Sequence, residues 1–269
     1  MSTPEGTRPL SACTLVLATD LDGTFLGASE AERRRLYDWI EANRATVGLI
    51  FVTGRDPRFI ARLCEGAEGL ATPWPEYVIG DVGTTIAAVT AGTGEARITP
   101  IPALEADIAQ RWADNGARVR QALDGHPGLT LQSADFRYRI SYDLDPATYE
   151  PSAAQIVSDL GLDHLISDNR FFDVLPRGVS KGPSLLRLIE HLGVDPARVL
   201  AAGDTLNDLS MLASGLKAVA VGNSEPGLLA HLDGLDNVHC ARAPGAGGIL
   251  EAIEAFALHP LSRGGVDAL

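Results

Sequence analysis

The sequence Leu15-Val16-Leu17-Ala18 is followed, one residue later, by Asp20-Leu21-Asp22-Gly23-Thr24. The apolar run is too short for a helix and too apolar for a surface strand, so we expect a buried strand of a parallel sheet. Asp20 and Asp22 would then stand at its carboxyl end, where open parallel sheets bind ligands. A calcium loop is the alternative, but the third alternate ligand and the terminal Glu of that pattern are missing.

A second stretch repeats this pattern near residue 204. The apolar run 199–202 is followed by Gly203-Asp204-Thr205-Leu206-Asn207-Asp208. If the two strands are neighbours, four carboxylates crowd into one small volume, and their repulsion requires a cation or raised pKa values. Capping of the next helix explains Asp204 but not Asp208. Oxygen ligands without a matching His or Cys cluster favour Mg²⁺ over Zn²⁺.

Two further segments suit a phosphate group. Thr53 and Gly54 follow the apolar run 47–52 and precede a predicted helix, so a hydroxyl and a backbone N–H are available to a phosphate oxygen. Lys181 stands at another predicted helix start, where a cation is unfavourable unless it meets an anion. We therefore expect Lys181 to neutralise both Asp20 and a phosphoryl group.

Strands and helices alternate along both ends of the chain, as in parallel βαβ units. Between them, residues 84–101 read as an antiparallel hairpin with a Gly-rich turn at Thr90–Gly94, and a mixture of helices and alternating strands continues to residue 175. We predict an α/β fold: a Rossmann-like parallel-sheet core at residues 1–84 and 177–269, with an inserted α+β cap domain at 85–176.

Composition limits the partners. The formal net charge of −13 over 269 residues offers no basic footprint for nucleic acid or for an anionic membrane. No segment reaches the roughly 20 apolar residues of a membrane span, and the first twelve residues lack a leader pattern. Three widely spaced cysteines fit reduced thiols. The expectation is a cytoplasmic protein that binds neither nucleic acid nor membranes.

The order of these motifs closely resembles the haloacid dehalogenase superfamily of phosphohydrolases, and the long insert resembles its type IIB cap. The resemblance implies Asp20 as nucleophile, Asp22 as general acid and base, and Mg²⁺ as cofactor. It also implies phosphate contacts from Thr53, Gly54 and Lys181, with help from Asn207. The implied metal ligands are Asp20, the carbonyl of Asp22, Asp204 and, directly or through water, Asp208.

Other stretches are similar to the sucrose-phosphate phosphatase subgroup, which includes phosphatases of mannosylfructose phosphate and glucosylglycerol phosphate. They are Gly80–Thr84, Arg139–Tyr142, Phe172–Pro176 and Gly245–Glu251. Leu206 stands where sucrose-type members tend to have Gly, and Gly23 where some have Asn. These departures leave sucrose 6-phosphate and glucosylglycerol phosphate both open as substrates.

The sequence thus predicts a Mg²⁺-dependent phosphomonoester hydrolase that removes phosphate from a glycosylated sugar or polyol phosphate through an aspartyl-phosphate on Asp20. Arg55 and four residues nearer the cap, Asp81, Arg137, Arg139 and Tyr142, are predicted substrate contacts. The alternatives are a mannosylfructose-phosphate phosphatase, a phosphosugar mutase and a non-catalytic sugar-phosphate sensor. A functional link to the glycosyltransferase that makes the substrate is a further hypothesis.

Overall fold

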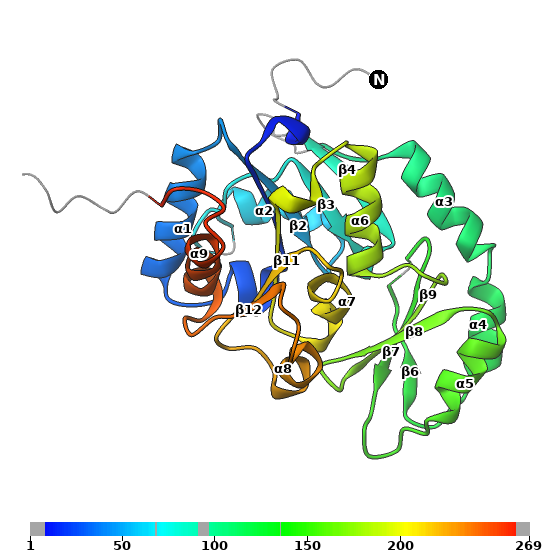
Figure 1. The fold of residues 1–269 in the computed structure, drawn as a ribbon. Helices are drawn as coiled ribbons and strands as arrows, with labels where there is room; N and C mark the ends of the chain where they lie inside the picture. The colour runs from blue at the N-terminus through cyan, green and yellow to red at the C-terminus, as the bar shows by residue number, and fades with distance from the viewer. Residues whose placement is uncertain (1–8, 68, 91–96, 135, 262–269) are drawn as a thin grey trace, which may run out of the picture.

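Two sheets carry the fold of this computed structural model, which describes residues 9–67, 69–90, 97–134 and 136–261 (Figure 1). The larger sheet has eight strands in the order β12-β11-β10-β1-β2-β3-β4-β5, and the smaller has four in the order β6-β7-β9-β8. The strands of the large sheet are β1 (Leu15–Thr19), β2 (Val47–Val52), β3 (Tyr77–Gly80), β4 (Thr85–Thr90), β5 (Arg97–Pro100), β10 (Val199–Gly203), β11 (Lys217–Ala220) and β12 (Val238–Cys240).

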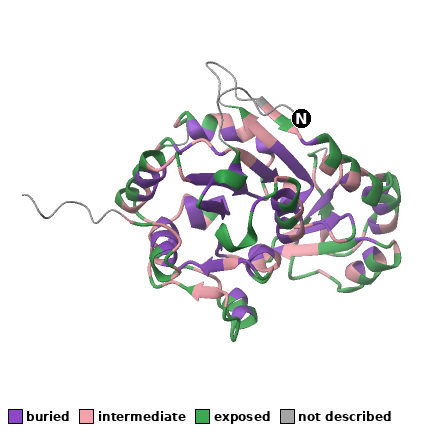
Figure 2. Ribbon diagram, turned by 45° about the horizontal axis from the view of Figure 1, so that its top comes forward, coloured by how far each residue is buried: buried purple, intermediate pink, exposed green. Residues whose placement is uncertain are grey.

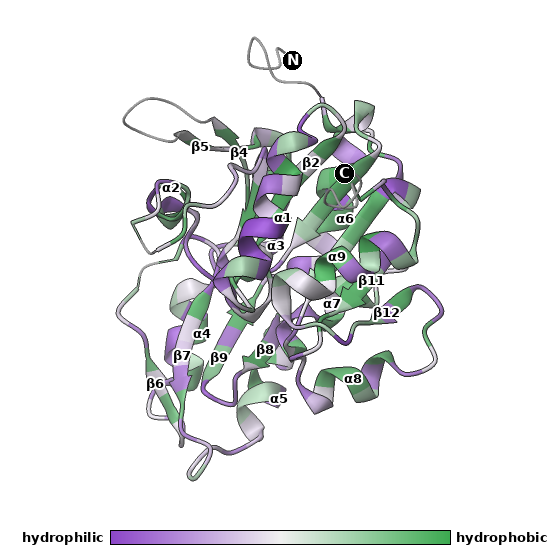
Figure 3. Cartoon of the chain, turned by 90° about the vertical axis from the view of Figure 1, so that its left-hand side faces the viewer, coloured by the Kyte–Doolittle hydropathy of each residue, from purple (hydrophilic) through white to green (hydrophobic). Residues whose placement is uncertain are grey.

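Helices cover both faces of the large sheet because its strands are apolar on both sides. In β1, Leu15 and Leu17 pack with α1 (Glu30–Ala42) and α9 (Gly245–Ala255), while Val16 and Ala18 pack with the helices of the opposite face. The remaining helices of this unit are α2 (Ile60–Cys64), α3 (Pro102–Trp112), α6 (Lys181–His191), α7 (Leu209–Leu212) and α8 (Pro226–Leu232). Figures 2 and 3 show the central strands as buried and hydrophobic.

The smaller unit has its own core. Its elements are α4 (Gly116–Leu123), β6 (Leu129–Leu131), β7 (Ile140–Leu144), α5 (Ser152–Asp159), β8 (Asp163–Ser167) and β9 (Phe171–Leu175). Both helices pack on one face of the antiparallel sheet through residues such as Val119, Val157 and Phe172. The opposite face of this sheet carries Ser141 and Asp173, which are polar although buried. That face is therefore built for a polar contact.

The α/β core with an α+β insert agrees with the sequence prediction. However, the segment that begins at residue 85, which was expected to belong to the insert, pairs with the large sheet. β4 pairs antiparallel with β3, and β5 with β4, so both extend the large sheet. A β-branched hairpin does not reveal which sheet it joins, because its pattern is the same in both. The predicted turn at Thr90–Gly94 lies almost entirely outside the described residues. We propose that the cap begins after α3, whose Ile108 packs in the core of the large sheet.

Two local predictions have different outcomes. The sequence of residues 103–115 predicts one helix, but α3 ends at Trp112, because Ala113 and Asp114 adopt positive φ angles of 48° and 53°, and α4 then starts at Gly116. Ser29 with Glu32 three residues later predicts a capping box for α1, and it is present: Ser29 Oγ accepts from Glu32 N, and Glu32 accepts from Ser29 N. Within the described part of the chain, no helix is both long and apolar enough to cross a membrane.

Candidate active site

The two acidic motifs meet at the carboxyl ends of β1 and β10. These strands are parallel neighbours, with Thr19 opposite Ala202, and Asp20 N donates to Ala202 O at 2.9 Å. Asp20 and Asp204 therefore follow adjacent strands, which is the condition under which the sequence predicted a crowded carboxylate cluster. The shared edge results from the sheet order, because parallel strands end on the same side of the sheet.

Lys181, the first residue of α6, lies at the centre of this cluster. Its Nζ donates to Asp20 Oδ1 at 2.6 Å, to Asp208 Oδ1 at 2.7 Å and to Asn207 Oδ1 at 2.7 Å. The side chain is 1% exposed, so these three acceptors replace the water that its ammonium would otherwise bind. Lys181 thus joins both acidic motifs, as expected.

Three buried carboxylates, Asp20, Asp204 and Asp208, each present an oxygen within 4.8 Å of the others. Asp204 Oδ1 accepts from Thr24 Oγ1 at 2.7 Å, and its Oδ2 accepts from Asn223 Nδ2 at 3.3 Å. Asp208 Oδ2 accepts from the backbone N–H of Asp204 at 3.0 Å and orients the loop. Gly23 has a φ of +79°, and a Cβ there would lie 2.1 Å from Asp204 Oδ2, so only glycine fits.

The cluster holds more negative charge than Lys181 balances. Burial raises the pKa of Asp20 well above its usual value; Lys181 opposes this, and Asp208 and Asp204 add to it. Burial likewise raises the pKa of Asp204 to about 6, although the Thr24 hydrogen bond lowers it. Burial acts to lower the pKa of Lys181, but Asp20 and Asp208 more than reverse this. An added cation would stabilise all three carboxylates.

Asp22 lies apart from the three-carboxylate cluster. Its carboxylate is 56% exposed and accepts from Arg55 in a bidentate pair, with Arg55 Nε at 2.8 Å from Asp22 Oδ2. The Arg55 guanidinium also lies 5.0 Å from the centre of the Phe59 ring. Thr53 is buried, and its Oγ1 accepts from Arg55 N at 3.1 Å. Arg55 therefore connects the predicted phosphate loop to the predicted acid and base.

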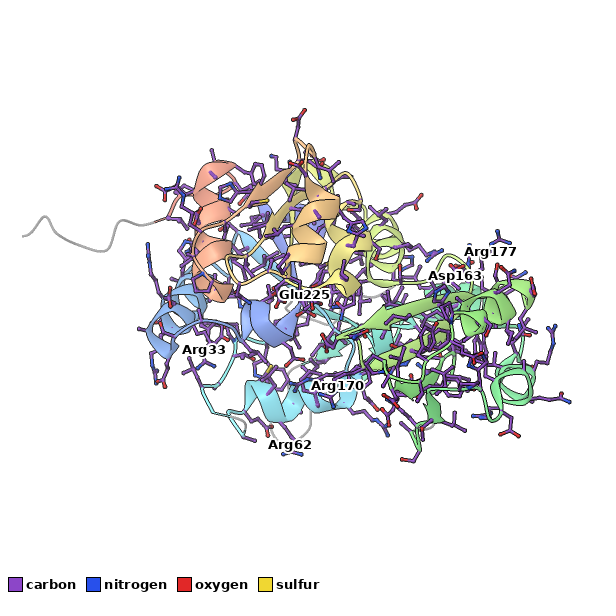
Figure 4. The ribbon with its side chains drawn as sticks, turned by 90° about the horizontal axis from the view of Figure 1, so that it is seen from below. Arg33, Arg62, Asp163, Arg170, Arg177 and Glu225 are labelled. Carbon is purple, nitrogen blue, oxygen red and sulfur yellow. The ribbon has the colours of Figure 1, made fainter. Side chains whose placement is uncertain are left out.

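A cavity of about 430 Å³ opens between the two units and reaches this cluster. Its lining from the core consists of Asp20, Asp22, Gly54, Arg55, Val82, Thr205 and Asn207. Its lining from the cap consists of Gln132, Arg139, Ser141, Ser167, Asp168, Phe171 and Asp173. Figure 4 views the two units from below, with side chains of both labelled, among them Arg170 of the cap and Glu225 of the core.

The cap contributes polar groups that the sequence analysis missed, notably Ser141 and Asp173. Ser141 Oγ donates to Asp173 Oδ1 across β7 and β9. The available signal was a charged residue inside the apolar run of β9, since an acid there must have a buried partner or a ligand. Asn223 was also missed, because a single Asn after a strand is typical of an ordinary turn.

Three predicted substrate contacts, Asp81, Arg137 and Tyr142, do not line this cavity. Tyr142 packs in the cap core and does not line this cavity, because side chains alternate along β7 and place it on the face opposite Ser141. Arg137 pairs with Glu105 and lines a separate cavity of about 320 Å³. Asp81 lines that second cavity too. Its Oδ1 lies 3.9 Å from Nη2 of Arg139, which lines the first cavity. Arg55 and Arg139 are the predicted contacts that line the cavity of about 430 Å³.

Comparison with known proteins agrees with this geometry. A family model described as sucrose-6F-phosphate phosphohydrolase matches residues 13–257. A glucosylglycerol-phosphate synthase of Pseudomonas anguilliseptica is 38% identical over 94% of the chain, which spans only 32% of that relative's length. A mannosylfructose-phosphate phosphatase of Agrobacterium fabrum is 29% identical, with 91% of this chain and 98% of that protein covered.

Among solved structures, the sucrose-phosphatase of Synechocystis, in complex with sucrose and phosphate, has a TM-score of 0.77 and 25% identity. The match covers 91% of this chain and 98% of that one. A haloacid dehalogenase-like hydrolase of Bacillus subtilis matches with a TM-score of 0.65 at 16% identity, which shows the fold alone. The expected fold with its cap is therefore confirmed.

Proposed function

Because the chain is a phosphatase that belongs to the sucrose-6F-phosphate phosphohydrolase family, we propose that it hydrolyses the phosphate monoester of a glycosylated sugar or polyol. The observation that carries the proposal is the buried contact of Lys181 with Asp20 and Asp208, at the end of a cavity lined by polar cap residues. A nucleophilic carboxylate, a phosphate-binding cation and a sugar-sized space adjoin each other there.

The donor set fits Mg²⁺. Asp20, Asp204 and Asp208 offer only oxygens, these oxygens lie within 4.8 Å of one another, and Lys181 balances only part of their negative charge. As the family resemblance implies, the ion would be held by Asp20, the Asp22 carbonyl, Asp204 and Asp208. When bound, Mg²⁺ neutralises phosphoryl charge and the crowded carboxylates together.

The chemistry then proceeds in two steps. An Asp20 oxygen attacks phosphorus, the bond to the sugar oxygen breaks, and Asp22 gives that oxygen its proton. Asp22 next takes a proton from water, whose oxygen attacks phosphorus and releases inorganic phosphate from Asp20. The phosphoryl oxygens are held by Thr53, Gly54, Lys181 and Asn207. Arg55 keeps the Asp22 carboxylate near the leaving group.

The substrate's glycosyl group would occupy the cap side of the cavity. Its volume of about 430 Å³ falls within the usual range of small-molecule sites, and Gln132, Ser141 and Asp173 suit a compound rich in hydroxyls. Sucrose 6-phosphate, glucosylglycerol phosphate and mannosylfructose phosphate are the candidates. The relative called a glucosylglycerol-phosphate synthase supports the second, and supports a functional link to a glycosyltransferase.

Phosphate release from these three compounds and from simple hexose phosphates, with Mg²⁺ or with EDTA, tests the proposal. We expect a glycosyl phosphate to be preferred, EDTA to abolish turnover, and Asp20→Asn to lower kcat by at least about 10⁴-fold. Full Mg²⁺-dependent turnover by Asp20→Asn would exclude the covalent step. A preference for hexose phosphates would exclude the substrate class, and transfer of the phosphoryl group to a second sugar would indicate a mutase.

A further inference from the structure

The three consecutive carbonyls of the phosphate loop, Thr53 to Arg55, all accept hydrogen bonds from outside that loop. Thr53 O accepts from Val82 N at 3.2 Å, and Arg55 O accepts from Asp81 N at 3.0 Å. The middle carbonyl, Gly54 O, accepts from Arg139 Nη1 at 3.4 Å. Two of the donors belong to the core, and the third is a side chain of the cap.

The turn that supplies the two backbone donors is held in an unfavourable conformation. Asp81 and Val82 have φ angles of 52° and 59°, a region that a β-branched residue such as Val82 rarely enters. Gly83 follows with a φ of +102°, and a Cβ there would lie 2.4 Å from the backbone of Ser180, next to Lys181. The turn therefore lies tightly between the phosphate loop and the start of α6.

Arg139 connects this turn to the cap. Its side chain is 6% exposed, with Nη2 at 3.9 Å from Asp81 Oδ1 of the core and Nη1 at 3.6 Å from Asp173 Oδ1 of the cap. The guanidinium also lies 3.6 Å from the centre of the Phe136 ring. A planar group with several donors suits such a position, because it meets acceptors in different directions at once.

The Gly54 carbonyl matters because of the peptide to which it belongs. In a trans peptide the C=O and the following N–H point in opposite directions, so a donor on Gly54 O directs Arg55 N–H the other way. That N–H donates to Thr53 Oγ1 at 3.1 Å, the hydroxyl expected to contact phosphate. The nitrogen of this peptide belongs to Arg55, whose side chain binds the carboxylate of Asp22.

We propose that Arg139 is a positioning residue through which the cap completes the phosphate site, by binding Gly54 O and Asp81 in the core. The inference rests on the proposed function, since it takes residues 53–55 to be the phosphate loop. It differs from a sugar contact in one respect: Arg139 acts on phosphate binding even when the ligand carries no sugar.

The test uses two ligands without a sugar, inorganic phosphate and p-nitrophenyl phosphate. Calorimetry with Mg²⁺ present measures phosphate affinity, and steady-state kinetics give kcat/KM, for wild type, Arg139→Ala and Arg139→Lys. We expect Arg139→Ala to lower both quantities by up to about 100-fold, the scale on which small misplacements act. Arg139→Lys should recover only part of the loss, because lysine keeps the positive charge but its ammonium reaches fewer of the acceptors than the guanidinium does.

Asp81→Asn provides a second route to the same result. It should also weaken phosphate binding. In the double variant the two effects should be less than additive, because each single substitution removes the same contact between Arg139 and Asp81. Arg118→Ala is the matched control: this cap arginine bonds to Asn115 Oδ1 at 2.6 Å near the start of α4 and should change neither quantity. Circular dichroism and Tm confirm that each variant is folded.

Each remaining outcome has a definite meaning. Unchanged phosphate affinity and unchanged p-nitrophenyl phosphate turnover in folded Arg139→Ala would overturn the proposal, and a loss confined to glycosyl phosphates would make Arg139 a sugar contact. If Arg139→Ala fails to fold, Arg139→Lys and Asp81→Asn decide by the same two readouts. If the wild type hydrolyses no phosphate ester, the proposed function fails, while the calorimetry still tests the positioning role.

Discussion

Lys181 Nζ lies 2.6 Å from Asp20 Oδ1, although the two residues are 161 positions apart in the chain. The same ammonium lies 2.7 Å from Asp208 Oδ1, and all three side chains are almost fully buried. One cation therefore holds the ends of β1 and β10 and the start of α6 together. We therefore expect Lys181 to affect both the stability of the protein and the proposed activity.

Replacing Lys181 with Met should destabilise the protein, because it leaves buried carboxylates without their cation. Breaking a buried pair from one side costs about 3–5 kcal/mol of unfolding free energy. Urea unfolding without Mg²⁺ measures the loss, and added Mg²⁺ should restore part of it. Lys217→Met is the matched control, since the chain's other lysine donates to Ala197 O at an exposed position. Equal stability of the two variants would contradict the prediction.

Replacing Arg55 with Ala should affect substrates according to their leaving groups. Without its bidentate partner the Asp22 carboxylate loses its fixed position, and proton donation to the leaving oxygen becomes less effective. An alkyl phosphate needs that proton more than p-nitrophenyl phosphate does. The measurement is kcat/KM for both compounds, and an equal loss for both would mean that Arg55 contacts phosphate only.

Replacing Asn223 with Ala should weaken Mg²⁺ binding more than it lowers the maximal rate. Asn223 Nδ2 donates to Gly23 O at 3.0 Å and to Asp204 Oδ2, and its Oδ1 accepts from Gly245 N at 2.9 Å. Removal of such an orienting partner typically costs about 10–100-fold in metal affinity. Titration of activity with Mg²⁺ tests this, with Asn43→Ala at the end of α1 as control. An unchanged Mg²⁺ requirement would argue against the role.

Glu76 provides a prediction about pH that is independent of the site. Burial raises its pKa, with Arg44 opposing, and it accepts from Leu49 N at 2.7 Å. A carboxyl group with a raised folded-state pKa contributes stability at low pH, and that contribution disappears as the pH rises through the folded-state pKa. Glu76→Gln removes this dependence.

The unfolding free energy of Glu76→Gln minus that of wild type should therefore increase from pH about 4 to pH about 8. Urea unfolding of both proteins at the two values measures it, and the difference cancels the titration of all other groups. Glu41→Gln, a more exposed acid beside the same Arg44, is the control. A difference that stays constant with pH would show that Glu76 titrates normally.

The sequence alone predicted which residues form the buried cluster of Asp20, Lys181, Asp204 and Asp208, because their pattern is local. Apolar runs that end in Asp20 and Asp204 predict strand ends, and Lys181 at a helix start predicts an anion nearby. The structure confirms that these residues meet. The α/β core, the capped helix α1 and the insert were predictable for the same reason, since each depends on short-range periodicity.

The tertiary structure decided everything that depends on pairing between distant segments. It assigned β4 and β5 to the large sheet, because strand partners are chosen by register and not by composition. It placed Tyr142 in the cap core and Asp173 toward the cavity, because strand alternation sends neighbouring residues to opposite faces. It brought Arg139 to Gly54 across the two units, a contact over 85 positions that no local pattern specifies. Local sequence patterns thus predicted the residues of the carboxylate cluster, while packing between the two units determined which residues line the cavity beside it.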